Sequence, residues 1–183
     1  MNNQIVKGSL SEVAQTSGKS LAEVWLDVDA MILVDVSWSM VGKDNTELSR
    51  LDRARKELIR LQGEMSGKLA IVSFSESVEF HANGILPDEQ STTNLTGALK
   101  YALRSDAIPG FRFVIISDGE PDNSESALKV AKSFKNKIDT VFIGGDFDGG
   151  RKFLEKLSGV SGGKSMSEKA EHLESAVVAL LEG

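Results

Sequence analysis

The feature that most constrains the fold is the segment MILVDVSWSM at residues 31–40. Its first four residues are apolar, which is enough for a strand buried on both faces, and an aspartate and two alternate serines follow directly. In an open parallel sheet, ligands bind beyond the carboxyl ends of the strands. We therefore predict that Asp35, Ser37 and Ser39 lie at a functional site.

Buried strands and amphipathic helices alternate along the rest of the chain. Strands are predicted at residues 30–36, 69–74, 111–116 and 138–143, with short strands at 78–81 and 164–166. Helices with one apolar stripe are predicted at 51–65, 95–102, 127–134, 153–157 and 173–180. This alternation indicates a doubly wound, Rossmann-like α/β fold, with helices on both faces of a mostly parallel central sheet and one short antiparallel edge strand.

The N-terminal region carries its own helix signals. Two pairs of residues have the spacing of a capping box, in which a serine and a glutamate three positions later satisfy each other's backbone amides: Ser9 with Glu12, and Ser20 with Glu23. Apolar residues recur after each pair. We therefore predict a helical extension, residues 1–25, packed on a single domain that spans residues 26–183.

Composition narrows the possible partners. The formal net charge is -6 and the basic residues are dispersed, which disfavours nucleic acid and anionic membranes. There are no cysteines and only two histidines, so a metal ion would have to be held by oxygen atoms. Residues 1–7 have no apolar signal core, and no apolar run is long enough to span a bilayer. We therefore expect a soluble, cytoplasmic protein.

Several polar residues are predicted to be solvated. His81 on the predicted edge strand and His172 in the last helix have no partner that the sequence identifies. The basic residues at positions 50, 53, 55, 56 and 60 are predicted to lie mostly on the solvent-exposed face of their helix.

Three strand ends or helix starts offer hard oxygen donors. They are Asp35 with Ser37 and Ser39, then Thr93 before a helix, and Asp118 after a core strand. Such donors suit Mg²⁺, Mn²⁺ or Ca²⁺. If the hydroxyls bind directly and the aspartates act partly through water, the ion keeps more positive charge and attracts a carboxylate from another molecule. An aspartate followed by serines is, by itself, also an ordinary turn and cap.

In this order, the three motifs resemble the metal-ion-dependent adhesion site of von Willebrand factor type A (VWA) domains. The motifs are Asp35-x-Ser37-x-Ser39, Thr93-Asn94-Leu95 and Ser117-Asp118-Gly119-Glu120-Pro121, and the resemblance covers roughly residues 28–182. The resemblance implies that Ser37, Ser39 and Thr93 coordinate the ion directly, and that Asp35 and Asp118 do so directly or through water. It also implies that the site captures an acidic residue of a partner protein.

Two features leave alternatives open. Trp38 stands where many members of that family have glycine, and it either narrows the approach to the metal or provides an aromatic anchor for the partner. Thr92, Thr93 and Thr96 lie close together in the sequence. Thr93 is the predicted ligand because Asn-Leu follows it and because it precedes the helical periodicity.

These observations predict a divalent-metal-dependent protein-binding module that is not an enzyme and has no catalytic residues. By resemblance, it would be an intracellular adaptor whose partner, presenting an Asp or Glu side chain, is a MoxR-type AAA+ ATPase or a stress-response assembly. The alternative is a Mg²⁺-dependent hydrolase or phosphotransferase. Position 37 is Ser where an Asp-x-Asp site needs Asp, and there is no phosphate-binding loop and no suggested Ser-His-Asp trio. A third hypothesis is a purely structural subunit, in which the metal only holds the loops in place.

Overall fold

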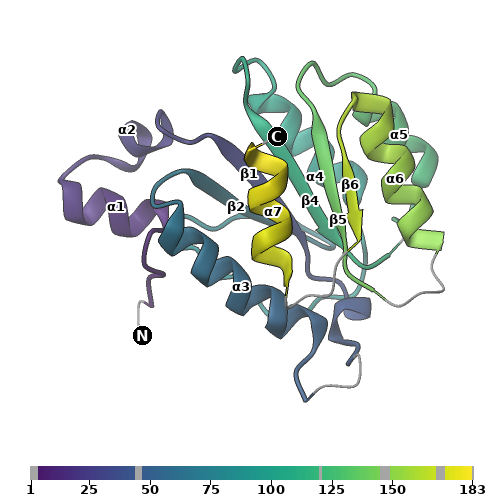
Figure 1. Cartoon of the computed structure of the whole chain (residues 1–183), viewed down its shortest axis with the longest axis horizontal. Helices are drawn as coiled ribbons and strands as arrows, with labels where there is room; N and C mark the ends of the chain where they lie inside the picture. The colour runs from purple at the N-terminus through teal and green to yellow at the C-terminus, as the bar shows by residue number, and fades with distance from the viewer. Residues whose placement is uncertain (1–3, 44–46, 120, 145–148, 168–171, 183) are drawn as a thin grey trace.

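A twisted sheet lies between two layers of helices (Figure 1). The computed structural model describes residues 4–43, 47–119, 121–144, 149–167 and 172–182. Within these ranges the strands are β1 (Ala30–Asp35), β2 (Leu69–Phe74), β3 (Val78–Phe80), β4 (Arg112–Ser117), β5 (Ile138–Phe142) and β6 (Ser165–Ser167). Their order is β3-β2-β1-β4-β5-β6, and only the pairing of β3 with β2 is antiparallel. This confirms the predicted fold class.

The central strand β1 fixes where the strand ends meet. Every residue of β1 and of β2 is buried, as their continuous apolar runs require for strands covered on both faces. The register pairs Val34 with Ile116 on β4 and Asp35 with Phe74 on β2. The carboxyl ends of these three parallel strands therefore lie side by side, and the loops that follow them share one edge of the sheet.

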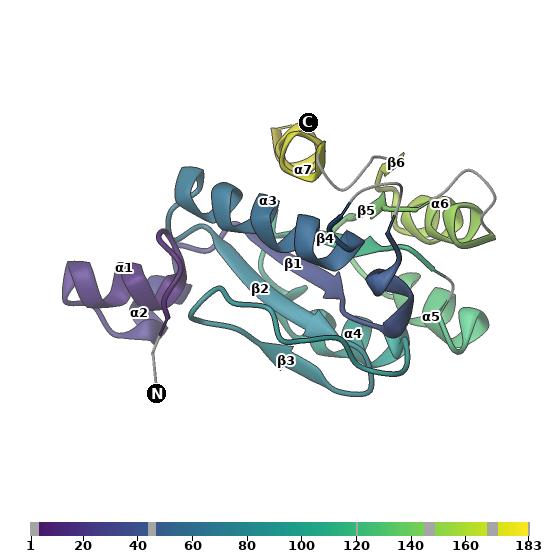
Figure 2. The ribbon, with the colours of Figure 1, turned by 90° about the horizontal axis from the view of Figure 1, so that it is seen from below.

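Each face of the sheet has its own layer of helices (Figure 2). The helices are α1 (Leu10–Ser17), α2 (Leu21–Trp25), α3 (Arg50–Glu64), α4 (Leu95–Ala102), α5 (Ser124–Ala131), α6 (Gly149–Ser161) and α7 (Leu173–Glu182), with short 3₁₀ helices η1 (Trp38–Val41) and η2 (Leu103–Ser105). Helices α3 and α7 pack on the face that carries Ile32 and Val34. Helices α4, α5 and α6 pack on the face that carries Met31 and Leu33.

Helices α1 and α2 lie at one end of the molecule, against the start of β1 and the end of α3 (Figure 2). Leu10 and Val24 are buried in the same apolar cluster as the α4 side of the sheet. The backbone amide of Gly67 donates to the carbonyl of Gly8 at 2.9 Å, and that of Val6 donates to Asn83 at 3.0 Å. The extension thus packs on the rest of the chain, while the boundary at residue 25 stays a prediction.

The two N-terminal helix starts differ in detail. Ser20 and Glu23 form the complete capping box. At α1, the Ser9 hydroxyl accepts from the Glu12 amide, but the Glu12 carboxylate accepts from the amide of Gly8 instead of that of Ser9. The same sequence spacing therefore gives two slightly different caps, both of which satisfy otherwise unpaired amides.

His81 lies just after the edge strand β3, and the prediction that it is solvated was wrong. It is half-buried, and its Nε2 lies 2.7 Å from the hydroxyl of buried Ser73 on β2. Burial lowers the pKa of His81, and the charge of Glu79 acts in the opposite direction. No local sequence pattern indicates this contact, because it depends on the register of the β2–β3 hairpin.

This contact predicts a pH-dependent loss of stability. A histidine whose pKa is lower in the folded state stabilises the fold above its unfolded pKa of about 6.5, and the contribution is lost as the pH falls through the folded pKa. We expect the urea midpoint of the wild-type protein to fall more between about pH 7.5 and pH 5 than that of His81→Asn. The same fall in both proteins would contradict the prediction.

Candidate metal centre

Asp35 forms the floor of the candidate site at the end of β1. The residue is buried, and both of its carboxylate oxygens have partners: Oδ1 accepts from the Ser37 amide at 2.9 Å, and Oδ2 accepts from the Ser117 hydroxyl at 2.6 Å. Burial raises the pKa of Asp35 to about 6, although the hydrogen bonds from Ser117 and Ser37 act to lower it. A buried carboxylate in this position favours a bound cation.

The two serines connect Asp35 to Asp118. Ser37 precedes η1, whose tight turn brings its hydroxyl within 3.0 Å of the Ser39 hydroxyl. The Ser39 hydroxyl donates to Oδ1 of Asp118 at 2.6 Å, across 79 residues of sequence. Four of the five predicted residues are therefore brought together at one strand edge. Ser37 and both aspartates are buried, whereas Ser39 is exposed, so the group opens to solvent at Ser39.

Thr93 lies in a neighbouring loop at the same edge of the sheet. This loop is attached to the strand ends because the Gln90 amide donates to Val36 at 2.8 Å and the Asn94 amide donates to Ser75 at 3.0 Å. The backbone carbonyl of Thr93 accepts a hydrogen bond from the Asp122 amide at 3.3 Å. Within the described ranges, no hydrogen bond joins the Thr93 hydroxyl to the other four predicted residues. Its role as a ligand stays a prediction.

Arg50 is the residue of this site that the sequence did not reveal. Its Nη1 donates to Oδ2 of Asp118 at 2.7 Å, and the Asp118 side chain is fully enclosed while that of Arg50 is 18% exposed. The prediction that the basic residues of this helix lie mostly on its solvent-exposed face was therefore wrong for Arg50, and also for Arg53, which is 7% exposed. Arg50 is the first residue of α3. At this position the contacts of the side chain depend on the loops around the helix start, and the apolar stripe of the helix does not predict them.

The start of α6 packs closely on the loop that carries Asp118. A Cβ atom on Gly150 would lie 3.0 Å from the Gly119 backbone, which is tighter than ordinary side-chain contacts. Helix α6 is longer at both ends than the short helix predicted at 153–157, because it begins at Gly149 and ends at Ser161. Glu120, Asp146 and Asp148 lie outside the described residues.

The chemistry of the assembled donors fits a hard divalent cation. Two carboxylates and two hydroxyls lie together, and the hydroxyls are hydrogen-bonded to each other and to Asp118. Hard oxygen ligands of this kind are those that bind Mg²⁺, Mn²⁺ and Ca²⁺. In the part of the chain that the structure describes, no three His, Cys, Asp or Glu side chains form a cluster that would hold a metal. A cation here would therefore depend on the serine hydroxyls as well as on Asp35 and Asp118.

Trp38 lies beside this group on η1 and is 69% exposed. It is not part of the core, since its neighbour Met40 occupies the buried position of the same short helix. An exposed indole next to a polar site is a common anchor at protein interfaces. The role of Trp38 as a barrier or as an anchor stays a prediction.

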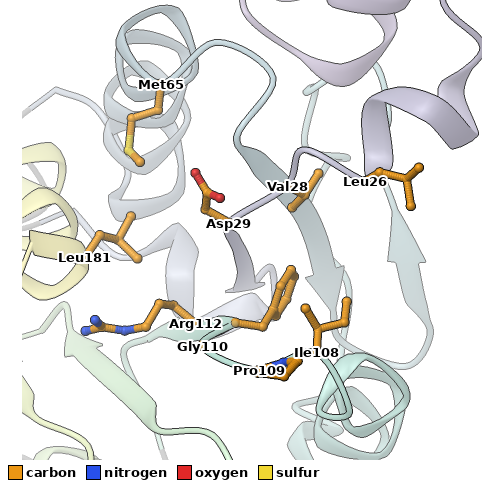
Figure 3. Close-up of a pocket in the computed structure, with 10 residues that line it drawn as sticks. Leu26, Val28, Asp29, Met65, Ile108, Pro109, Gly110, Arg112 and Leu181 are labelled. Atoms are coloured by element: carbon orange, nitrogen blue, oxygen red, sulfur yellow. The ribbon is translucent and has the colours of Figure 1, made fainter.

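A hollow among the described residues lies at the other end of the strands (Figure 3). It encloses about 490 Å³ between residues that precede β1 and β4 and the end of α7. Its charged side chains pair with residues beyond it: Asp29 lies 3.4 Å from Lys68, and Arg112 lies 3.0 Å from Asp139 on β5. The candidate metal site and this hollow are thus separate features of the fold.

Comparison with solved structures identifies the fold. A von Willebrand factor type A structure from Catenulispora acidiphila aligns with a TM-score of 0.64 and 17% identity, covering 85% of this chain and 42% of that one. An aerotolerance-related membrane protein from Bacteroides fragilis aligns with a TM-score of 0.61 and 16% identity, covering 85% and 98%. The manganese-loaded TRAP protein of Plasmodium vivax gives a TM-score of 0.57 and 15% identity, covering 85% and 73%.

These structures define the class: the chain has the VWA fold, as the sequence motifs implied. No protein-family model matches the sequence, and no curated protein matches it either. None of the helices within the described ranges has the length and apolar character needed to cross a bilayer.

Proposed function

We propose that this chain is a divalent-metal-dependent protein-binding module. The observation that carries the proposal is the convergence of Asp35, Ser37, Ser39 and Asp118 at one strand edge, linked by contacts of 2.6 to 3.0 Å and open to solvent at Ser39. The VWA fold supports a role in protein interaction. The chain would act by binding and not as an enzyme.

Mg²⁺ is the proposed ion, with Mn²⁺ or Ca²⁺ as alternatives. Ser37, Ser39 and Thr93 would bind it through their hydroxyls, and Asp35 and Asp118 would hold it directly or through water. A bound ion would supply a Lewis-acidic position for a carboxylate oxygen of the partner. The manganese-loaded state of TRAP, which shares the fold, supports a divalent ion in this position.

The proposed partner is a protein that presents an Asp or Glu side chain to the ion. A MoxR-type AAA+ ATPase or a stress-response assembly in the cytoplasm is the candidate that the motifs imply. The acidic net charge of -6 supports a protein partner over a nucleic acid or an anionic membrane surface. The exposed Trp38 would lie at the edge of the contact.

Asp118→Asn tests the proposal directly. The substitution keeps the shape of the side chain but removes its charge, so we expect Mg²⁺ and Mn²⁺ affinity, measured by isothermal titration calorimetry, to fall more than about a hundredfold. Asp88→Asn is the matched control, because that side chain is 98% exposed and pairs with Arg55 instead of with a residue of the site. In the wild type, metal at a hundred times its Kd is expected to stabilise the fold by about 2.7 kcal/mol.

Two results would overturn the proposal. One is a wild-type protein that binds neither Mg²⁺ nor Mn²⁺. The other is phosphate release from a generic phosphoester in the presence of Mg²⁺ that Asp35→Ala abolishes, which would favour the hydrolase reading. If metal binds, affinity capture from the native source with Mg²⁺ or EDTA, and with Asp118→Asn in parallel, would then identify the partner.

A further inference from the structure

The charge of Asp118 is already neutralised by the chain itself. Its Oδ1 accepts from the Ser39 hydroxyl at 2.6 Å, and its Oδ2 accepts from Nη1 of Arg50 at 2.7 Å. The Asp118 side chain is fully enclosed. An arginine therefore serves as the counter-charge of one of the two carboxylates that the proposed metal would need.

The position of Arg50 is fixed by its surroundings. The Ser49 hydroxyl caps α3 by accepting from the Asp52 amide at 3.0 Å, and the Arg50 amide donates to the Gly42 carbonyl at 3.0 Å. A Cβ atom on Gly42 would lie only 3.5 Å from Cζ of Arg50 and 3.6 Å from its Nη1. The guanidinium thus lies against the bare backbone of Gly42 and reaches Asp118 from there.

We infer that Arg50 is a tethered cation that competes with the metal for Asp118. This inference rests on the proposed function, because it concerns the same site. A divalent ion held by Asp118 would bring two positive groups onto one enclosed carboxylate, where repulsion is poorly screened. Metal binding therefore requires the guanidinium to give up its hydrogen bond to Oδ2. Since arginine stays protonated throughout the physiological pH range, this competition is present at every working pH.

If Arg50 competes with the metal, removing its charge should strengthen metal binding, which would not be expected if Arg50 only packed against its neighbours. Without the guanidinium, the carboxylate of Asp118 is available to the ion, so Arg50→Gln is expected to bind Mn²⁺ at least about tenfold more tightly than the wild type. In EDTA the same variant is expected to have a lower melting temperature, because the enclosed carboxylate has lost its charge partner. Saturating Mn²⁺ is expected to raise that temperature by more in the variant than in the wild type.

The experiment is a calorimetric titration of the full chain with MnCl₂, in the wild type and in Arg50→Gln, Arg50→Met and Arg50→Lys. The lysine variant keeps the charge, and its affinity is expected to stay within about threefold of the wild type. Arg55→Gln is the matched control, since Arg55 is on the same helix but pairs with Asp52 and Asp88. Arg50→Met, which keeps much of the side-chain length, provides a second neutral variant if Arg50→Gln does not fold.

The outcomes separate the two proposals. Tighter Mn²⁺ binding by a neutral Arg50 variant, with the control unchanged, supports the competition. Binding by the variant alone, when the wild type binds neither Mg²⁺ nor Mn²⁺, supports the competition but overturns the metal-dependent function of the wild type. If the wild type binds Mn²⁺ and the neutral variants bind it equally or more weakly, the competition is overturned while the metal-binding function stands. If no variant binds Mn²⁺, both proposals are overturned.

Discussion

Asp35→Asn is expected to stabilise the metal-free protein by about 3 kcal/mol at about pH 7.5 and to abolish metal binding. Burial raises the pKa of Asp35 from 3.8 to about 6. A carboxyl group with a raised folded pKa stabilises the fold fully below its unfolded pKa, and the contribution is lost as the pH rises through the folded value. Above about pH 6 the wild type therefore carries a buried negative charge that asparagine removes.

Asparagine can keep both local hydrogen bonds of this position. Its Oδ1 can accept from the Ser37 amide, and its Nδ2 can donate to the Ser117 hydroxyl, which donates to the carboxylate in the wild type. The variant should therefore fold with the same strand end. What it lacks is the negative charge that a divalent ion requires, so Mg²⁺ should no longer raise its stability.

Urea unfolding in EDTA at about pH 5 and pH 7.5 measures the effect. The stability gain of Asp35→Asn over the wild type should be larger at the higher pH, and Asp88→Asn should show no such gain. Mg²⁺ at a hundred times the wild-type Kd should nearly close this gap, because only the wild type binds the ion and gains about 2.7 kcal/mol. A variant that is destabilised to the same extent at both pH values would show that the carboxylate is not under electrostatic strain.

The stability gained by Asp35→Asn reflects a trade-off at the site. A group placed to bind a cation is unfavourable when the cation is absent, and functional sites commonly retain such residues. Arg50 reduces this cost at Asp118, while Asp35 is neutralised only by its own proton or by a metal. The buried charge of Asp118 is thus balanced by an arginine of the same chain, whereas that of Asp35 is balanced only by a proton or a bound metal.

The sequence predicted the parts of this structure that depend on local pattern. The run that ends at Asp35 predicted a fully buried strand, and the similar run that ends at Ser117 predicted a second. Parallel strands end at the same edge, so the convergence of Asp35 and Asp118 followed from the topology. The local pattern was sufficient in these cases because a continuous apolar run of strand length is typical of a strand covered on both faces.

Contacts that depend on three-dimensional placement were not predictable in this way. Arg50 meets Asp118 across 68 residues of sequence, and its place in the first turn of α3 puts it beyond the reach of the helix-face pattern. His81 meets Ser73 only because of how the hairpin turns. Thr93 shows the intermediate case: its loop lies at the predicted edge, but side-chain direction in a loop has no periodic signal.

Gly8→Ala is expected to destabilise the protein by about 3 kcal/mol or more. Gly8 has a φ of 80°, which disfavours any residue with a side chain, and a Cβ atom there would overlap the backbone carbonyl of Gln62 in α3. Gln62 cannot easily move, because it is 1% exposed and its Nε2 donates to the carbonyls of Leu58 and Gly84 at 3.1 Å each. The substitution therefore forces apart the N-terminal segment and the last turn of α3.

Gly18→Ala separates the two causes of this effect. Gly18 has a similar φ of 71°, but nothing lies within 4 Å of a Cβ atom at that position. Its substitution should cost only the conformational penalty, about 1 kcal/mol. The difference between the two variants in urea unfolding thus measures how firmly the N-terminal segment is held against α3. Equal losses would mean that the segment detaches at little cost, and that residues 1–25 are an appendage on a domain that is stable without them.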